Sequence, residues 1–246
     1  MTFPDDTPAP AAIARILAAT DHRPFVVGQL GQSLDGRIAT PTGESRWING
    51  SAALAHLHAI RAVVDAVVVG VGTVVADDPR LNVRLVTLPP GRLQPARVVL
   101  DPRGRVPHQA VCFDPATGGP TIQIVGPHLA RRSSDGPPAH VRQLEVPTTD
   151  GRFCPRAVVQ RLFDEGYRTL LIEGGAATVS AFLQAGALDR LHVLVAPVLI
   201  GSGTSGLTLP GIDKISEAQR PKCETHAFED GDVLFDCDLR TCLPAS

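Results

Sequence analysis

The chain has 246 residues, of which 43% are hydrophobic and 20% charged, a balance typical of a folded globular protein rather than a disordered one. Its 23 basic and 25 acidic side chains nearly cancel, so the basic excess of a nucleic-acid-binding surface is missing. The apolar runs are shorter than the roughly 18 residues that span a bilayer. The N-terminus, MTFPDDTPAP, does not resemble a signal sequence. We therefore expect a cytoplasmic protein with no nucleic-acid or membrane partner.

The cysteines and histidines do not indicate a metal centre. The chain has five cysteines, an odd number with no C-x-x-C spacing, which argues against a disulfide framework and against a structural zinc site. We expect these cysteines to be reduced and mostly to pack in the interior. The eight histidines include one close pair, His56 and His58, but residues two apart point to different sides of a helix. We therefore predict no bound metal.

The order of apolar runs predicts the fold class. Residues 1–23 form an N-terminal arm with a short helix at 11–19, and residues 24–246 form one domain. Helix-patterned segments separate several of the β-rich runs, which lie at 25–30, 65–70, 96–100, 121–125, 141–146, 168–172 and 191–200. This alternation predicts an α/β fold with a mainly parallel central sheet flanked by helices. The Asp-Gly pair in Glu229-Asp230-Gly231 predicts a C-terminal antiparallel hairpin.

The first β-rich run ends at the sequence GQSLDGRIAT, which places Asp35 at a strand terminus. One interpretation is a plain Asp-Gly turn, in which Asp35 bonds its own backbone and Gly36 adopts a positive φ. The other is a functional carboxylate, and the choice depends on the rest of the chain.

The helix-patterned segment that follows ends in a buried charge. Asn49 or Ser51 can cap this helix, and its apolar stripe leads to Arg61, which leans inward. A guanidinium in that position needs a carboxylate or phosphate partner, because an unpaired buried charge is costly. The partner is either a structural one, Asp65 or Asp77, or a bound ligand.

The run DAVVVGVG has the apolar character of a central parallel strand and ends in glycines followed by Thr73. Ligands in open α/β sheets bind at such strand ends. The GVG sequence lacks the rest of a dinucleotide fingerprint and is a weak signal. The next loop, ADDPRLNVR, is either a solvated turn or a binding loop, and it gathers Asp77, Asp78, Arg80 and Arg84.

A second glycine turn follows the strand at 168–172, in the sequence TLLIEGGAATVSAFLQAG. Glycines here would let the backbone approach a phosphate, and the helix that follows would present free N–H groups to it. A simple strand-to-helix turn is the alternative, but it does not explain Glu173, which we expect to face a substrate. The chain has no G-x-S-x-G, no Walker lysine and no zinc-deaminase motif, so hydrolase, kinase and deaminase functions lose support.

Taken in order, GQSLDGRIA, GESRWI, RAVVDAVVVGVGTVVADDPRLNVR, ARVVLDPRGRVP, LLIEGG and APVLIGSG resemble the reductase domain of the bacterial riboflavin-biosynthesis deaminase-reductases. The resemblance covers about residues 24–240. It implies a dihydrofolate-reductase-like fold, NADPH as cofactor and a homodimer. It also implies reduction of 5-amino-6-(5-phosphoribosylamino)uracil to its ribitylamino form. The zinc deaminase half is missing, so the chain looks like a stand-alone reductase.

The resemblance also implies roles for individual residues. Asp35 and Glu173 would be catalytic, with Asp35 beside the reacting centre, where it could bind an open-chain imine or help to move its proton. The substrate-binding residues would be Ser45, Arg61, Leu81, Arg84 and Glu173. Among them, Arg61 and Arg84 would bind the substrate phosphate. The cofactor-binding residues would be Gln32, Trp47, Thr73, Asp77 and the turn and helix start from Gly174 to Ala181, which includes Gly175, Ala176, Ala177 and Thr178.

The chain departs from this family at two positions. Gln29 stands where many relatives carry lysine, which puts cationic help at the substrate in doubt. Pro102 stands at the cofactor edge where others often have serine, so a hydroxyl near the 2′-phosphate is lost.

Cofactor choice therefore depends on the residues around that proline. Asp101 near an adenosine ribose would favour NADH, because a carboxylate repels a 2′-phosphate. Arg103 and Arg105 favour NADPH, because a guanidinium pairs with phosphate. We predict NADPH, with one of these arginines on its 2′-phosphate. The alternative is that both are solvated surface charges.

Three functions remain in competition. The first is the riboflavin-pathway reductase, and the second is an NADPH-dependent reductase of the same fold for another pterin-like or pyrimidine-like compound. The third is a nucleotide-binding protein without turnover, which has no need for a phosphate clamp beside a nicotinamide pocket. The presence of Asp35, Arg61, Arg84 and Glu173 together disfavours this third function.

Overall fold

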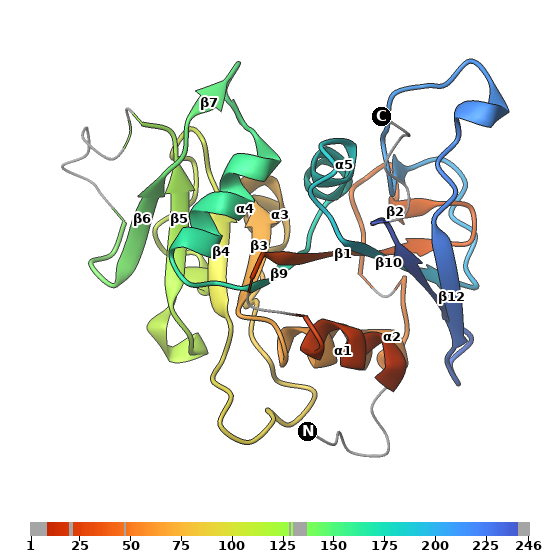
Figure 1. The fold of residues 1–246 in the computed structure, drawn as a ribbon, viewed down its shortest axis with the longest axis horizontal. Coiled ribbons are helices and arrows are strands. Elements are labelled where there is room, and N and C mark those ends of the chain that lie inside the picture. The colour runs from red at the N-terminus through yellow and green to blue at the C-terminus, as the bar shows by residue number, and fades with distance from the viewer. Residues whose placement is uncertain (1–8, 20–21, 47, 128, 130–136, 241–246) are drawn as a thin grey trace.

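A nine-stranded sheet organises the chain (Figure 1). The computed structural model describes residues 9–19, 22–46, 48–127, 129 and 137–240. The strands of the large sheet are β1 (Phe25–Ser33), β3 (Ala66–Gly70), β4 (Ala96–Leu100), β5 (Thr121–Val125), β6 (Val141–Glu145), β9 (Thr169–Ile172), β10 (Arg190–Ala196), β12 (Lys222–Ala227) and β13 (Val233–Asp238). Their order across the sheet is β12-β13-β10-β1-β9-β3-β4-β5-β6.

Neighbouring strands are parallel from β10 to β6, and the C-terminal β12–β13 hairpin adds two antiparallel strands at the other edge. The predicted α/β fold with a mainly parallel sheet and a C-terminal antiparallel hairpin is therefore confirmed. Two small strand pairs lie outside this sheet. They are β2 (Arg37–Ala39) with β11 (Thr204–Ser205), and β7 (Thr148–Thr149) with β8 (Arg152–Phe153).

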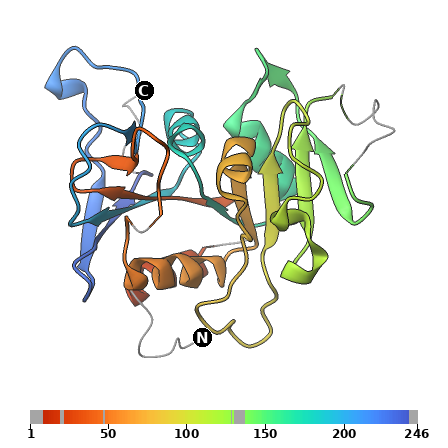
Figure 2. The same ribbon diagram turned by 180° about the vertical axis from the view of Figure 1, so that it is seen from behind.

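The helices cover both faces of the sheet. They are α1 (Pro10–Leu17), α2 (Ser51–Arg61), α3 (Val71–Asp77), α4 (Pro155–Asp164) and α5 (Ala176–Gln184), with short 3-10 turns at Val111–Phe113, Pro115–Thr117 and Ile215–Glu217. Figures 1 and 2 show α1 and α2 on one face and α4 and α5 on the other. No helix in the part of the chain that the structure describes is long and apolar enough to cross a membrane.

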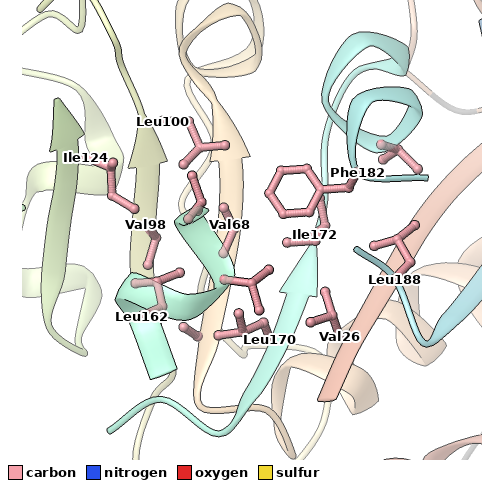
Figure 3. Packing of buried hydrophobic residues seen from close by; sticks show 14 of the residues in the cluster. Val26, Val68, Val98, Leu100, Ile124, Leu162, Leu170, Ile172, Phe182 and Leu188 are labelled. Atoms are coloured by element: carbon pink, nitrogen blue, oxygen red, sulfur yellow. The ribbon is translucent and has the colours of Figure 1, made fainter. Parts of the chain in front are cut away.

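The central strands are apolar at nearly every position because both of their faces are covered. Val68 packs in the cluster beneath α4 and α5, which Figure 3 shows from close by. Val67 and Val69 point the other way, into the cluster that includes α1 and α2 residues. Ile13 and Ile16 of α1 are fully buried there, so the helix of the predicted arm packs on the core.

Several boundaries differ from the sequence prediction. The last predicted run, 191–200, ends at Ala196, because Pro197 has no N–H to continue the ladder. The helix predicted at 11–19 spans Pro10–Leu17. The short helix α3, directly after β3, was not predicted.

The cap of α2 was also predicted wrongly. Neither Asn49 nor Ser51 caps this helix, whose N-cap is Gly50. The hairpin turn supplies the missing acceptors instead. The Gly50 N–H donates to Asp232 Oδ2 (2.9 Å), and the Ala52 N–H donates to Asp230 Oδ2 (2.8 Å). Two aspartates from the far end of the chain therefore hold the start of α2 by satisfying its free N–H groups.

The expectation that the cysteines mostly pack in the interior is wrong for those the structure describes. Cys112 is buried, but Cys154 and Cys223 are exposed and Cys237 is half-buried. All four are free thiols.

Candidate active site

Two glycine turns meet at the carboxyl ends of neighbouring parallel strands. β3 ends at Gly70 and leads into α3, while β9 ends at Ile172 and leads through Glu173-Gly174-Gly175 into α5. Because β3 and β9 pair in parallel, both turns lie at the same edge of the sheet. This is the edge at which open α/β sheets bind their ligands.

The two turns approach so closely that only glycine fits. The Gly175 N–H donates to Thr73 Oγ1 (3.0 Å). A Cβ at Gly174, which has φ +115°, would lie 2.7 Å from the same hydroxyl oxygen, and a Cβ at Gly70 would lie 2.5 Å from Thr178 Oγ1. No side chain caps α5 at Gly175. The N–H groups of Ala176 and Ala177 are therefore available to an anion, as the predicted phosphate cradle requires, whereas that of Thr178 donates to the Gly175 carbonyl (3.1 Å).

Glu173, just before this cradle, forms a buried ion pair with Arg61 at the end of α2. Arg61 Nε and Nη2 donate to the two carboxylate oxygens of Glu173, each at 2.6 Å, and Nη1 donates to the Asn82 carbonyl (3.1 Å). Arg61 is only 6% exposed and Glu173 only 5%. The prediction of Asp65 or Asp77 as the structural partner of Arg61 is wrong, because the carboxylate bonded to Arg61 belongs to the residue directly after β9, Glu173. A two-pronged bond of this kind compensates burial of both charges.

A cavity of about 560 Å³ opens beside this pair. Its lining includes seven of the predicted site residues, namely Ser45, Arg61, Asp77, Arg84, Glu173, Gly174 and Gly175. Gln29, the departure from the family pattern, also lines it. The apolar part of the wall, which includes Leu54 and Leu57 on α2, was not predicted. Its sequence signal is the apolar stripe of α2, which cannot be distinguished from an ordinary core-facing stripe.

Positive charge is in excess around this cavity. Burial, with Arg61 and Arg80 nearby, lowers the pKa of Arg84 from its usual range. Burial and the charges of Arg61 and Arg84 lower the pKa of His58 to about 3, so its ring is neutral. His58 Nδ1 accepts from the Arg84 N–H (3.1 Å). The cavity is lined by three arginines (Arg46, Arg61 and Arg84) and two carboxylates (Asp77 and Glu173), so net positive charge remains to attract an anion after Glu173 has neutralised Arg61.

The loop that carries Arg84 is held on several sides. The Gln94 amide makes two bonds to the Val83 backbone, accepting from its N–H (2.7 Å) and donating to its carbonyl (2.9 Å). The Asn82 amide donates to the Thr117 carbonyl (3.1 Å). Leu81 has φ +56°, and its side chain is 1% exposed in the core. Leu81 therefore shapes the loop from beneath and does not line the cavity.

Asp35 lies at the turn between β1 and β2 and does not line the cavity. Its carboxylate accepts from Ser33 Oγ (2.5 Å) and from the N–H groups of Ile200 (3.1 Å) and Gly201 (2.6 Å). These bonds lower the pKa of Asp35 to about 2. Gly36 has φ +80°, as the Asp-Gly turn predicts. The carboxylate thus anchors the loop after β10, and its role in a reaction stays a prediction.

The basic turn after β4 is organised from within. Asp101 is fully buried and its Oδ2 accepts from the Val106 N–H (2.8 Å) and from Gln123 Nε2 (3.0 Å). The carboxylate therefore points into the protein, which removes support from the alternative in which Asp101 contacts a ribose. Arg103 and Arg105 are exposed on the turn that this aspartate holds. Because Asp101 points inward, its carboxylate would not repel a 2′-phosphate at this turn, and the argument for NADH is weakened.

The remaining predicted residues lie around these features. Pro102 is half-buried beside the two exposed arginines. Gln32 lies on β1, where its Oε1 occupies the space beside Gly206. Ala176 and Ala177 form the first turn of α5, and Trp47 lies outside the described residues.

The two histidines predicted to diverge do so. His56 Nε2 lies 3.3 Å from His192 Nδ1, whereas His58 bonds the Arg84 backbone. Within the described ranges, no group of three or more His, Cys, Asp or Glu side chains could hold a metal ion.

The mainly parallel sheet with its antiparallel C-terminal pair, and a cavity at the carboxyl ends of the central strands, define an α/β protein with a ligand-sized site at the edge of its sheet. The chain belongs to the RibD C-terminal domain family, whose model matches residues 24–231. The resemblance found in the sequence is confirmed.

Three relatives show the extent of this similarity. The riboflavin biosynthesis protein RibD of Aquifex aeolicus is 33% identical over 83% of this chain and 56% of its own length. The 2,5-diamino-6-ribosylamino-4(3H)-pyrimidinone 5′-phosphate reductase of Methanothermobacter thermautotrophicus is 37% identical over 80% of this chain and 90% of its own. The structure of Acinetobacter baumannii RibD matches with a TM-score of 0.72 and 32% identity, over 88% of this chain and 58% of that one. The chain thus spans about half the length of its RibD relatives.

Proposed function

We propose that this chain reduces 5-amino-6-(5-phosphoribosylamino)uracil to its ribitylamino form with NADPH, as a step of riboflavin biosynthesis. The observation that carries the proposal is the cavity bordered by the Arg61–Glu173 pair and Arg84, directly beside the glycine cradle. An anionic sugar phosphate and a dinucleotide need these two sites next to each other. The similarity to a reductase over 90% of that relative's length supports the same reaction class.

The residues present fit a dinucleotide. Thr178 packs against Gly70 and Thr73 against Gly174, which holds the two turns side by side, and the uncapped start of α5 offers the free N–H groups of Ala176 and Ala177. These N–H groups and the Thr73 hydroxyl would hold the diphosphate, and Arg103 or Arg105 the 2′-phosphate. When bound, NADPH supplies the hydride, and the protein supplies position and field.

The arginines divide the work on the substrate. Arg84, which has no carboxylate bonded to it in the part of the chain that the structure describes, is the main contact for the 5′-phosphate. Arg61 already donates twice to Glu173, so it adds charge and fixes the Glu173 carboxylate at the cavity wall. Asp35 is ionised at neutral pH because its pKa is about 2, and it lies outside the cavity wall, so its contribution would be to hold the loop after β10 and to add negative charge near the site rather than to donate a proton.

The decisive experiment measures NADPH oxidation by the purified protein on two substrates in parallel, the phosphoribosylamino-uracil and the 2,5-diamino-pyrimidinone 5′-phosphate. The name of the archaeal relative makes the second compound the alternative substrate. Turnover of the uracil, together with complementation of a strain lacking only this reductase, is the expected result. Turnover of the pyrimidinone alone would reassign the substrate. Inactivity on both would leave another pterin-like or pyrimidine-like compound.

A homodimer is part of this proposal. The long apolar runs and the edge hairpin suggest a pairing surface. Large apolar side chains between β10 and β12 are exposed, among them Leu199 (74%), Ile212 (50%) and Ile215 (76%). Light scattering at micromolar concentration should give the mass of two chains, and a monomeric mass would contradict the dimer.

A further inference from the structure

The edge hairpin carries two cysteines that face each other across its strands. Cys223 on β12 is directly opposite Cys237 on β13, and their sulfur atoms lie 3.3 Å apart. Phe228 and Asp232 form a hydrogen-bonded pair at the turn, through the bond from the Phe228 N–H to the Asp232 carbonyl (2.8 Å). Hydrogen-bonded and non-hydrogen-bonded pairs alternate along an antiparallel ladder, so Cys223 and Cys237 form a non-hydrogen-bonded pair. Opposite side chains come closest in such pairs. The two thiols can therefore be bridged without a large backbone movement.

The two thiols differ in their surroundings. Cys223 is exposed on the outermost strand of the single chain, so a reagent in solution reaches it directly whenever that strand is not covered by a second chain. Cys237 is half-buried against the main core cluster. Burial and the neighbouring Cys223 thiol raise the pKa of Cys237. Because a thiolate is the attacking species, Cys223 is the point of entry and Cys237 the resolving thiol.

We propose that Cys223 and Cys237 are a reversible redox modification site, oxidised to a cross-strand disulfide by exchange with a small disulfide such as oxidised glutathione. The Cys223 thiolate attacks one sulfur of glutathione disulfide, breaking its S–S bond and releasing one glutathione. Cys237 then loses its proton to solvent, attacks the Cys223 sulfur and expels the second glutathione. The pair loses two electrons and two protons, and glutathione disulfide leaves as two thiols.

The bridge would act on a hairpin that supports the cavity. The turn between β12 and β13 carries Asp230 and Asp232, which hold the first turn of α2. α2 in turn carries Arg61. A covalent link between the two strands therefore stiffens the element from which α2 is held, whatever substrate the cavity takes.

The test equilibrates the full chain with mixtures of reduced and oxidised glutathione, followed by alkylation, digestion and mass spectrometry. The expected product is a peptide pair joined through Cys223 and Cys237, which increases with the oxidised fraction and disappears on return to reduced glutathione. Amide hydrogen exchange should slow in β12, β13 and the first turn of α2 when the link forms. The C154S variant, which removes an exposed cysteine outside the hairpin, directly before α4, should behave as wild type.

Three further variants decide the outcome. C237S should accumulate a glutathione adduct on Cys223 with no link and no change in exchange, and C223S should form no link at all. C242S should keep the link. Adducts on Cys154 and Cys223 alike with no linked peptide, or a link from Cys223 to Cys242 instead, would overturn the proposal.

Discussion

The molecule buries arginine–carboxylate pairs in two regions, which differ in charge balance and in access to a cavity. Around Asp236, Arg190 and Arg15 donate to its two carboxylate oxygens at 2.6 Å and 2.8 Å, and His192 Nε2 lies 3.1 Å from it. Asp238 also accepts from Arg190, so carboxylates match the guanidiniums there. At the site, Glu173 is the carboxylate bonded to Arg61, and Arg84 lines a cavity of about 560 Å³ without a bonded carboxylate among the described residues.

The two regions show the difference between charges that are paired within the fold and charges that are placed where a ligand can bind them. A buried ion pair by itself indicates only that the fold has satisfied its charges. Arg84, by contrast, is exposed at the wall of an open cavity, where solvent screens its charge and a ligand of opposite sign can reach it. We therefore expect loss of a partner in the Asp236 network to lower stability, and loss of the Arg84 charge to lower binding.

The largest expected effect is on the Asp236 network. D236N removes the charge that holds the buried Arg190 guanidinium and the partly exposed Arg15 guanidinium, so we expect a loss of about 3–5 kcal/mol in the free energy of unfolding. Urea denaturation measures it. The exposed E224Q, which removes the other partner of Arg15, is the matched control and should cost under about 1 kcal/mol. Equal losses of unfolding free energy in D236N and E224Q would contradict the distinction between the buried and the exposed ion pair.

R84A should lower affinity for the phosphorylated substrate, because it removes a charged contact worth about 1.5–3 kcal/mol. We expect KM to rise by one to two orders of magnitude with kcat little changed and the urea midpoint unaltered. R61A should weaken substrate binding too. It should also lower stability, because it leaves Glu173 buried without its partner. Unchanged KM and kcat/KM in both variants would rule out the phosphate clamp.

Mild acid should destabilise the site region first. The folded-state pKa of His58 is about 3 against an ordinary 6.5, so protonation favours unfolding as the pH falls below 6.5. The loss is about 2 kcal/mol at pH 5. Burial alone would raise the pKa of Asp236, but His192 and Arg190 outweigh it and hold that pKa well below its usual range. Its contribution therefore persists until the pH drops below about 4.

The check is the free energy of unfolding of wild type and H58Q at several pH values. H58Q, which removes the titratable ring, should flatten the dependence between pH 6.5 and 5. D236N should leave that part of the curve unchanged. The same slope in H58Q and wild type would show that another group is responsible.

The smallest expected effect concerns the exposed basic turn. Replacing Arg103 and Arg105 together with alanine should raise the Kd for NADPH by about tenfold, roughly 1.4 kcal/mol, and leave the Kd for NADH nearly unchanged. Titration of both cofactors by tryptophan or nicotinamide fluorescence measures this. An equal effect on the two cofactors, or none, would contradict the assignment of the 2′-phosphate.

The sequence was most informative where one short segment contains the whole signal. The run DAVVVGVG predicts β3 because an apolar residue at every position requires cover on both faces. The Asp-Gly pair predicts the β12–β13 hairpin because its turn needs a residue at positive φ, which Gly231 supplies at +89°. Boundaries were less certain, as at Pro197, because the end of a strand depends on the neighbouring strand as well.

The site was predictable in its residues but not in their pairing. Residue type and position placed Arg61 and Glu173 in the site, yet the local pattern suggested Asp65 or Asp77 as the partner of Arg61. Glu173 lies 112 positions away from Arg61, and only the pairing of β3 with β9 brings its strand end beside α2. In the sequence, Asp101 at the end of its strand is likewise a candidate ribose contact, but in the structure its side chain points inward and accepts from the Val106 N–H.

The sequence by itself therefore determined the strand and turn order, the glycine positions and the family to which the chain belongs, since each follows from local sterics, periodicity or ordered motifs. The tertiary structure decided which charges meet. It placed Asp230 and Asp232 at the start of α2, Glu173 against Arg61, and Cys223 beside Cys237. The reason is physical. A hydrogen bond or ion pair acts over a few ångströms, and chain segments far apart in sequence come within that range only when the sheet assembles.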